Sequence, residues 1–260
     1  MQVYRGMDVG TAKPTPAERV AVPHHLLDLA DPSEDFSVAE FQAAARAALA
    51  GIAARGHRAL LVGGTGLYLR AIVDDLRLPG RYPEVRADLE ADDDTPGLHA
   101  RLAVLDPRAA RRIESTNRRR VVRALEVTLG SGRPFSTYGP GLDAYPPTPV
   151  VQIGLRPPVD VLDRRIEARV HAMVAGGFLD EVRRLPRPLS RTAGQALGYR
   201  ELLAHLAGRV ALDRAVTDTV VRTRHFARRQ WRWFRRDPRV LWWDPGSRPP
   251  DALGDWRRCA

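Results

Sequence analysis

The amino-acid sequence predicts an α/β protein, because helical and strand-like segments alternate around a glycine-rich turn. A helix is expected over residues 37–55, where Ser37 and Glu40 have the spacing of a capping box and apolar residues recur at helical intervals. The apolar run 59–62 then predicts a buried parallel strand. The stretch 63–66, rich in glycine, ends that strand and leads into a second helix.

The pattern changes between residues 79 and 147, where only helical segments follow one another. Proline, glycine or acidic residues separate these segments, which lie at 84–91, 98–105, 107–113 and 119–129. We interpret this part as a helical insertion. The predicted organisation is a core at 1–78, the insertion at 79–147 and a continued core at 148–260.

The remaining elements return to the α/β pattern. Residues 1 to about 35 carry many glycines and prolines and predict loops with short elements. After the insertion the sequence predicts a strand at 150–155, helices at 158–175, 192–206 and 213–236, and a last strand at 240–243.

Charge points to a partner that carries phosphate. The net charge is +10 and the isoelectric point is near 10.7. All basic residues except Lys13 are arginines, which codon bias in a GC-rich genome explains. Codon bias does not explain the excess of 41 basic over 31 acidic residues, so nucleic acid or polyphosphate is the favoured partner and simple solvation is the alternative.

Other classes of protein are disfavoured. The sequence has no apolar run of about 18 residues, as a membrane span requires. Its first twenty residues are charged and lack the apolar segment of a secretory signal. The single cysteine, Cys259, permits neither an intramolecular disulfide nor a cysteine-based metal site. We expect a cytoplasmic, monomeric protein.

The turn at 63–66 is the first candidate site. Open α/β sheets bind ligands at the carboxyl ends of their strands, and a following helix N-terminus favours anions. Thr65 would present its hydroxyl there. The alternative is that these glycines serve only the turn.

Arginines supply the other candidates. Arg165 and Arg169 are four residues apart on one helix face, which suits a pyrophosphate; pairing with Asp163 or Glu167 is the alternative. Two further clusters, at 118–123 and 222–236, are typical of helices that contact nucleic-acid phosphates, although a solvated surface would show the same composition.

Taken together, these segments resemble the tRNA dimethylallyltransferase (isopentenyltransferase) family. The matching stretches occur in the family's order over nearly the whole chain, at 1–14, 23–28, 61–68, 83–86, 119–126, 195–200 and 229–236. The resemblance implies a parallel-sheet core like that of P-loop NTPases, with a helical insertion. It also implies nucleotide binding and the transfer of a dimethylallyl group from dimethylallyl diphosphate to an adenosine beside the anticodon of a tRNA.

The resemblance also implies roles for particular residues. Thr65 would act near the reacting amine or the leaving oxygen, and Arg165 and Arg169 would bind the pyrophosphate together with Mg²⁺. No protein ligands to a metal are implied. The anticodon stem-loop would contact Met1, Gln2, Thr65, Arg86, Arg119, Arg120, Val121, Val122 and Arg123.

One departure from the family concerns the start of the chain. The family pattern begins with a strand, a phosphate-binding loop and a catalytic aspartate that serves as general base, whereas Met1 aligns after that aspartate. We therefore expect a core without its first strands, apolar surface exposed near Val62 and Ile153, and impaired catalysis by this chain. The alternatives are a non-catalytic RNA-binding remnant and an adenylate isopentenyltransferase, and the basic surface and insertion argue against the latter.

Overall fold

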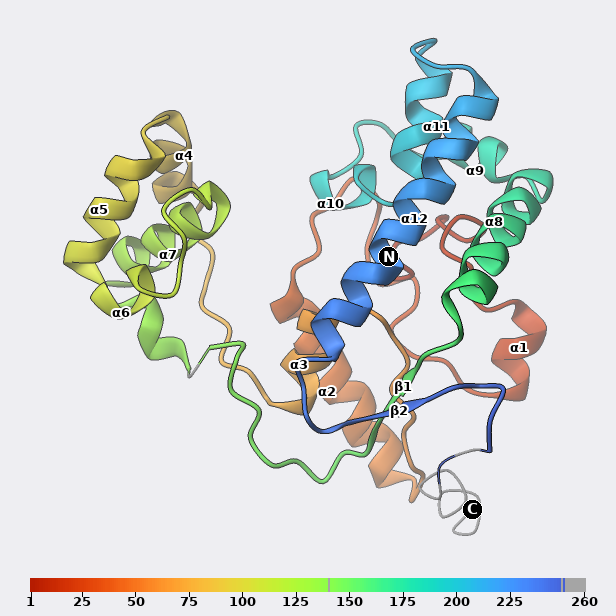
Figure 1. Cartoon of the computed structure of the whole chain (residues 1–260), viewed down its shortest axis with the longest axis horizontal. Coiled ribbons are helices and arrows are strands. Elements are labelled where there is room, and N and C mark those ends of the chain that lie inside the picture. The colour runs from red at the N-terminus through yellow and green to blue at the C-terminus, as the bar shows by residue number, and fades with distance from the viewer. Residues whose placement is uncertain (140, 249, 251–260) are drawn as a thin grey trace. The chain divides into compact units, whose positions relative to one another are not determined.

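The computed structural model describes residues 1–139, 141–248 and 250, so Cys259 lies outside the described residues. The chain forms two compact units. Unit 1 comprises Met1–Ile72 and Thr148–Ala260, and unit 2 comprises Val73–Pro147 (Figure 1). In the part of the chain that the structure describes, no helix combines the length and the apolar character that a membrane span requires.

Unit 1 contains a small parallel sheet. Its strands are β1 (Gln152–Leu155) and β2 (Val240–Trp243), which lie side by side in Figure 1. Gln152 lies opposite Val240, and Leu155 lies opposite Trp243. The predicted α/β class and these two strands are confirmed. Because the strands are parallel, their carboxyl ends meet at one edge of the sheet.

The strand predicted at 59–62 is wrong. Leu60 and Val62 are 70 % and 82 % exposed, and the segment has no ladder partner among the described residues. An apolar run becomes a strand only where a neighbouring strand accepts its hydrogen bonds. The expected exposure of apolar surface near Val62 is found, whereas Ile153 is half-buried in β1.

The predicted helices of unit 1 occur in the expected order, and α9 (Phe178–Arg184) is an additional helix that the sequence pattern did not predict. Helix α2 (Val38–Ala54) has the expected capping box, since Ser37 Oγ accepts from the amide of Glu40 and Glu40 Oε2 accepts from the amide of Ser37. The helix predicted at 192–206 is divided, because the backbone turns at Gly198 (φ +84°). The other helices are α1 (Pro16–Ala21), α3 (Gly66–Val73), α8 (Val159–Ala175), α10 (Arg191–Gly194), α11 (Tyr199–Leu206) and α12 (Leu212–Phe234).

Two apolar clusters hold unit 1 together. In one, Ile166 and Val170 of α8 pack with Val216 and Val220 of α12. The other joins the first residues of the chain to the helices that follow α8, and its largest buried members are Tyr4, Met7, Phe178, Tyr199 and Leu202. The N-terminal segment, defined as residues 1–13, is therefore part of the core.

Unit 2 is helical. Its elements are α4 (Pro83–Ala91), α5 (Thr95–Leu105), α6 (Pro107–Ala110), α7 (Arg118–Ser131) and the 3₁₀ helix η1 (Phe135–Tyr138). They enclose a core of their own that includes Leu89, Leu98, Leu102, Val121 and Leu125. Residues 73–147 contain twelve basic and twelve acidic side chains, so the net charge of +10 arises in unit 1.

Candidate functional site

Thr65 lies at the start of α3 with its side chain exposed. Its carbonyl accepts hydrogen bonds from the amides of Tyr68 (3.0 Å) and Leu69 (3.1 Å), which begins the helix. The hydroxyl has no hydrogen-bond partner among the residues that the structure describes. The side chain predicted to act on the substrate is thus fixed through its backbone and unengaged at its reactive end.

Helix α12 packs directly against the turn that carries Thr65. Gln230 Nε2 donates a hydrogen bond of 3.0 Å to the carbonyl of Gly64. A Cβ on Gly64 would lie 2.0 Å from that nitrogen, and a Cβ on Gly66 would lie 1.9 Å from Nε1 of Trp233. Gly66 is therefore required by packing against the Trp233 indole, and the Gln230 amide takes the space beside Gly64. This packing supports the structural alternative for both glycines without engaging Thr65.

Helix α2 packs against α3 as well. The rings of Phe41 and Tyr68 meet edge to face with centroids 4.8 Å apart. Gln42 is buried, and its Nε2 donates a hydrogen bond of 2.6 Å to the carbonyl of Ala71. Contacts from α2 and α12 together leave α3, and Thr65 at its start, little freedom to shift.

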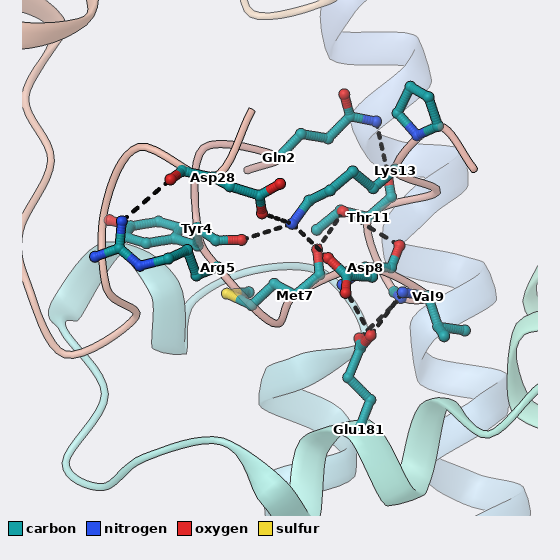
Figure 2. A network of polar contacts seen from close by, with 12 residues as sticks. Gln2, Tyr4, Arg5, Met7, Asp8, Val9, Thr11, Lys13, Asp28 and Glu181 are labelled. Carbon is teal, nitrogen blue, oxygen red and sulfur yellow. Dashed lines mark hydrogen bonds and ion pairs between the residues drawn. The ribbon is translucent and has the colours of Figure 1, made fainter. Parts of the chain in front are cut away.

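The N-terminal segment forms a second polar centre (Figure 2). Gln2 donates through Nε2 to the carbonyls of Thr11 (3.1 Å) and Ala12 (2.9 Å), while Met1 is 44 % exposed. The predicted tRNA contact Gln2 therefore also closes the loop on which it lies.

Lys13 is the centre of this network, and reasoning from the sequence missed it. Its side chain is 1 % exposed, and Nζ donates to the carbonyl of Tyr4 (2.8 Å), to Asp8 Oδ1 (2.5 Å) and to Asp28 Oδ1 (2.6 Å) (Figure 2). Burial alone would raise the pKa of Asp28, but the hydrogen bonds and charges of Lys13 and Arg19 outweigh it and lower that pKa. The signal in the sequence was that Lys13 is the single lysine among forty arginines. A compact ammonium group suits three converging acceptors better than a planar guanidinium does.

Glu181 of α9 holds the same segment from the other side. Oε2 accepts from the amides of Asp8 (2.8 Å) and Val9 (2.6 Å), and Oε1 accepts from the amide of Gly10 (3.1 Å) and the hydroxyl of Tyr199 (2.7 Å). Both side chains are buried. Burial, the hydrogen bond to Glu181 and its negative charge raise the pKa of Tyr199 far above its usual value.

Arg165 and Arg169 lie on an exposed face of α8. Neither forms an ion pair or hydrogen bond with a described residue. The acids that could have neutralised them are engaged elsewhere, because Asp163 pairs with Arg228 at 3.0 Å and Glu167 with Arg224 at 2.7 Å. The two cations are therefore available to a ligand.

Arg165 also lines a cavity of about 270 Å³ at the carboxyl ends of β1 and β2. The same cavity is lined by Pro157, Pro158, Val161, Asp244, Pro245 and Gly246. Parallel sheets bind ligands at this edge. Among the described residues, no group of three or more His, Cys, Asp or Glu side chains could hold a metal ion.

In unit 2, Arg86 and Arg123 make ion pairs within the protein. Arg86 Nη1 lies 3.2 Å from one oxygen of Glu126, and Arg123 Nη1 lies 2.7 Å from the other. The Glu126 side chain is only 2 % exposed, and it also accepts from the amide of Tyr82. A buried carboxylate needs such partners. The ion pair of Arg86 joins α4 to α7, whereas Arg123 pairs with Glu126 within α7 itself.

The other predicted RNA-contacting residues of α7, at 119–122, are of two kinds. Val121 and Val122 are 0 % and 2 % exposed and belong to the core of unit 2, so their side chains offer no surface to RNA. Arg119 and Arg120 are exposed and have no partner among the described residues. Within this run, the two valines therefore belong to the core, and the two arginines are exposed cations that a ligand could contact.

The arginines of α12 are also only partly free. Arg222 lies 3.2 Å from the buried Glu201, and Arg224 and Arg228 join α12 to α8. The Arg235 guanidinium lies over the ring of Trp231 at 4.7 Å. Arg232 is exposed and without a described partner.

Comparisons with known proteins agree with these motifs. Residues 2–237 match the family model described as IPP transferase. A tRNA dimethylallyltransferase from Kineococcus radiotolerans is 56 % identical over 248 residues, which are 93 % of this chain and 78 % of that protein. One from Streptomyces coelicolor is 52 % identical over 252 residues, covering 95 % and 80 %. The crystal structure of the tRNA isopentenylpyrophosphate transferase from Bacillus halodurans is similar with a TM-score of 0.68 and 39 % identity, covering 99 % of this chain and 84 % of that one.

Proposed function

The chain belongs to the IPP transferase family, and on that premise we propose that it transfers a dimethylallyl group from dimethylallyl diphosphate to an adenosine beside the anticodon of a tRNA. In this reaction the exocyclic nitrogen bonds to C1 of the allylic group, the C1–oxygen bond breaks so that pyrophosphate leaves, and the proton of the amine passes to the released pyrophosphate or to solvent. The enzyme class is that of the relatives, which are named as dimethylallyltransferases.

The single observation that carries the proposal is that Thr65 has a fixed backbone and an exposed hydroxyl. It lies in a stretch matched by the family model, on a turn held by α12, and its hydroxyl has no described partner. A hydroxyl donor on a backbone held in this way can stabilise charge that develops in the transition state. We assign Thr65 to the reacting amine or to the leaving oxygen.

Two free cations support a diphosphate site. Arg165 and Arg169 are exposed and unpaired among described residues, and Arg165 lines the cavity beside β1 and β2. Guanidinium groups hold phosphate oxygens through several charge-assisted hydrogen bonds. They would bind the leaving pyrophosphate and offset its growing charge.

A magnesium ion would accompany the diphosphate. Magnesium is commonly held by substrate phosphates with one or two carboxylates, so it needs no cage of three protein ligands. Asp244, which lines the cavity with Arg165, offers a carboxylate of this kind. The ion would partly neutralise the diphosphate.

The tRNA would be held mainly through its phosphates. Unit 1 carries the whole net charge of +10, and in unit 2 the free cations Arg119 and Arg120 extend from the first turn of α7. Such contacts position a nucleic acid without reading its sequence. The adenosine would then leave the loop stack to reach Thr65, at a cost of a few kcal/mol.

A direct transfer assay tests this function. The purified protein is incubated with dimethylallyl diphosphate and either a tRNA transcript or AMP, and the nucleosides are analysed by mass spectrometry. We expect a dimethylallyl adduct on one adenosine of the tRNA and none on AMP. RNA binding without any adduct would contradict the proposed enzyme, and an adduct on AMP alone would contradict the tRNA substrate.

A further inference from the structure

We propose that Gln230 is a positioning residue for the reaction, which acts by holding the turn that carries Thr65. This inference rests on the role that the proposed function gives to Thr65. Gln230 lies on α12, 166 residues from Gly64 in the sequence, and donates to the Gly64 carbonyl at 3.0 Å. The residue before Thr65 is thus tied to a distant helix by a side-chain hydrogen bond.

The side chains of α12 pack closely against the turn. The amide nitrogen of Gln230 occupies the space of a Cβ on Gly64, and the indole of Trp233 occupies that of a Cβ on Gly66. Residues 230 and 233 are three apart, so they project from the same side of α12. Both flank Thr65, one contacting the residue before it and the other the residue after it.

The later residues of α3 are held independently by α2. Phe41 and Gln42 of α2 contact Tyr68 and Ala71, one to two helical turns beyond Thr65. Loss of the Gln230 contact would therefore leave α3 in place and release only its N-terminal turn. A change of about 1 Å at a reacting group can cost roughly 10²-fold in rate. The expected defect is in catalysis rather than in folding.

Gln230→Met is the decisive variant, because methionine has a similar length and volume but no N–H donor. We expect kcat to fall by about 10- to 100-fold, with the KM of both substrates within about twofold and an unchanged melting temperature. The matched control is Thr217→Ala, an exposed position on the same helix. The control should keep normal kinetics.

A second variant covers the case in which Gln230→Met misfolds. Gly64→Ala places a methyl group 2.0 Å from Gln230 Nε2, so the flexible amide must move away and the hydrogen bond is lost. The backbone of Gly64 is not in the left-handed region, so alanine introduces no strain there. The same loss of kcat is expected.

A double-mutant cycle with Thr65→Ala separates this inference from the function on which it rests. If Gln230 acts through Thr65, the double variant should be no slower than Thr65→Ala alone. Full additivity, or a normal kcat in both Gln230→Met and Gly64→Ala beside a slow Thr65→Ala, would overturn the positioning role and leave the proposed function standing. A normal kcat in Thr65→Ala would instead remove the role of Thr65 and this inference with it.

Hydrogen exchange gives a readout that does not depend on activity. In Gln230→Met the amides of Tyr68 and Leu69, which bond to the Thr65 carbonyl, should exchange faster, because the first turn of α3 opens more often. Amides of α2 should be unaffected. Unchanged protection at Tyr68 and Leu69 would show that the hydrogen bond does not restrain the turn.

Discussion

The hydroxyl of Tyr199 lies 2.7 Å from Oε1 of Glu181 and donates a hydrogen bond to it within the core of unit 1. The same carboxylate accepts from three successive backbone amides of the N-terminal segment, at residues 8–10. Because a buried carboxylate is costly without a full set of donors, the two side chains stabilise each other's position. Tyr199 therefore supports the N-terminal segment through Glu181.

Replacing Tyr199 by phenylalanine should destabilise the protein. Oε1 of Glu181 would keep only the amide of Gly10, and loss of a hydrogen bond to a buried charge costs about 1–3 kcal/mol. Urea denaturation measures this difference. Tyr138→Phe is the matched control, because the Tyr138 hydroxyl has no partner among described residues. Equal stability of the two variants would contradict the role of the Tyr199 hydroxyl.

The pKa of Tyr199 predicts a loss of stability in alkali. The folded protein holds the phenolic proton because the pKa is raised, whereas the unfolded chain releases it above about pH 10. The stabilisation is thus fully present below that pH and is lost as the pH rises, by up to about 1.4 kcal/mol per pH unit. Melting temperatures between pH 8 and 11 should fall less steeply for Tyr199→Phe. Parallel curves for both proteins would exclude Tyr199 as the source.

Lys13→Arg should be destabilising although the charge is kept. Three acceptors converge on Nζ of a side chain that is 1 % exposed, and a planar guanidinium is larger and fits that arrangement poorly. Overpacking of this kind costs about 1–3 kcal/mol. Arg19→Lys is the control, because Arg19 pairs with Asp28 at the surface. A melting temperature for Lys13→Arg equal to that of the unchanged protein would be evidence against the three-acceptor site.

Arg119 and Arg123 should separate RNA binding from stability. Arg119→Ala should make the fall of log K with log salt less steep by about 0.7 to 0.9, which is the contribution of one phosphate contact. The melting temperature should not change, because Arg119 is exposed. Arg123→Ala should lower the melting temperature, because Glu126 loses its ion pair at 2.7 Å. Filter binding across salt concentrations and calorimetry measure the two effects. An unchanged slope for Arg119→Ala would make that arginine a solvated side chain only.

Arg169→Ala should affect one substrate only. Because Arg169 is exposed and has no described partner, its removal should leave the melting temperature unchanged. The KM for dimethylallyl diphosphate should rise by about tenfold or more, as expected when a charge-assisted contact is lost, while the KM for tRNA stays within twofold. Arg164→Ala on the same helix is the control. Earlier melting with a normal kcat/KM for dimethylallyl diphosphate would point to a structural role instead.

Local patterns predicted the helices well, because their signals lie within a few residues. Ser37 and Glu40 cap α2 reciprocally, as their spacing indicates. The strand predicted from the apolar run at 59–62 was wrong, because a strand forms only where a partner strand from elsewhere in the chain pairs with it. Periodicity also cannot show which members of a basic run, such as Arg119 or Arg123, bond to the protein itself.

The polar contacts of the site could not be predicted for the same reason. Glu181 bonds to amides 171 to 173 residues away, and Gln230 bonds to a carbonyl 166 residues away. No spacing rule covers such distances. Thr65 was predicted because it follows glycines at a turn, and its role stays a prediction, whereas Glu181 resembles any acid in the first turn of a helix.

The contact between Glu181 and residues 8–10 has a consequence for synthesis on the ribosome. About 170 residues must be added after residues 8–10 before Glu181 of α9 exists, which takes roughly ten to thirty seconds at 5–20 residues per second, and α11 follows later still. During that interval Tyr4 and Met7, later fully buried, have no completed core to enter. Apolar segments that wait in this way are natural targets for chaperones. Nascent chains released before α11 should therefore be captured by them far more than the finished protein.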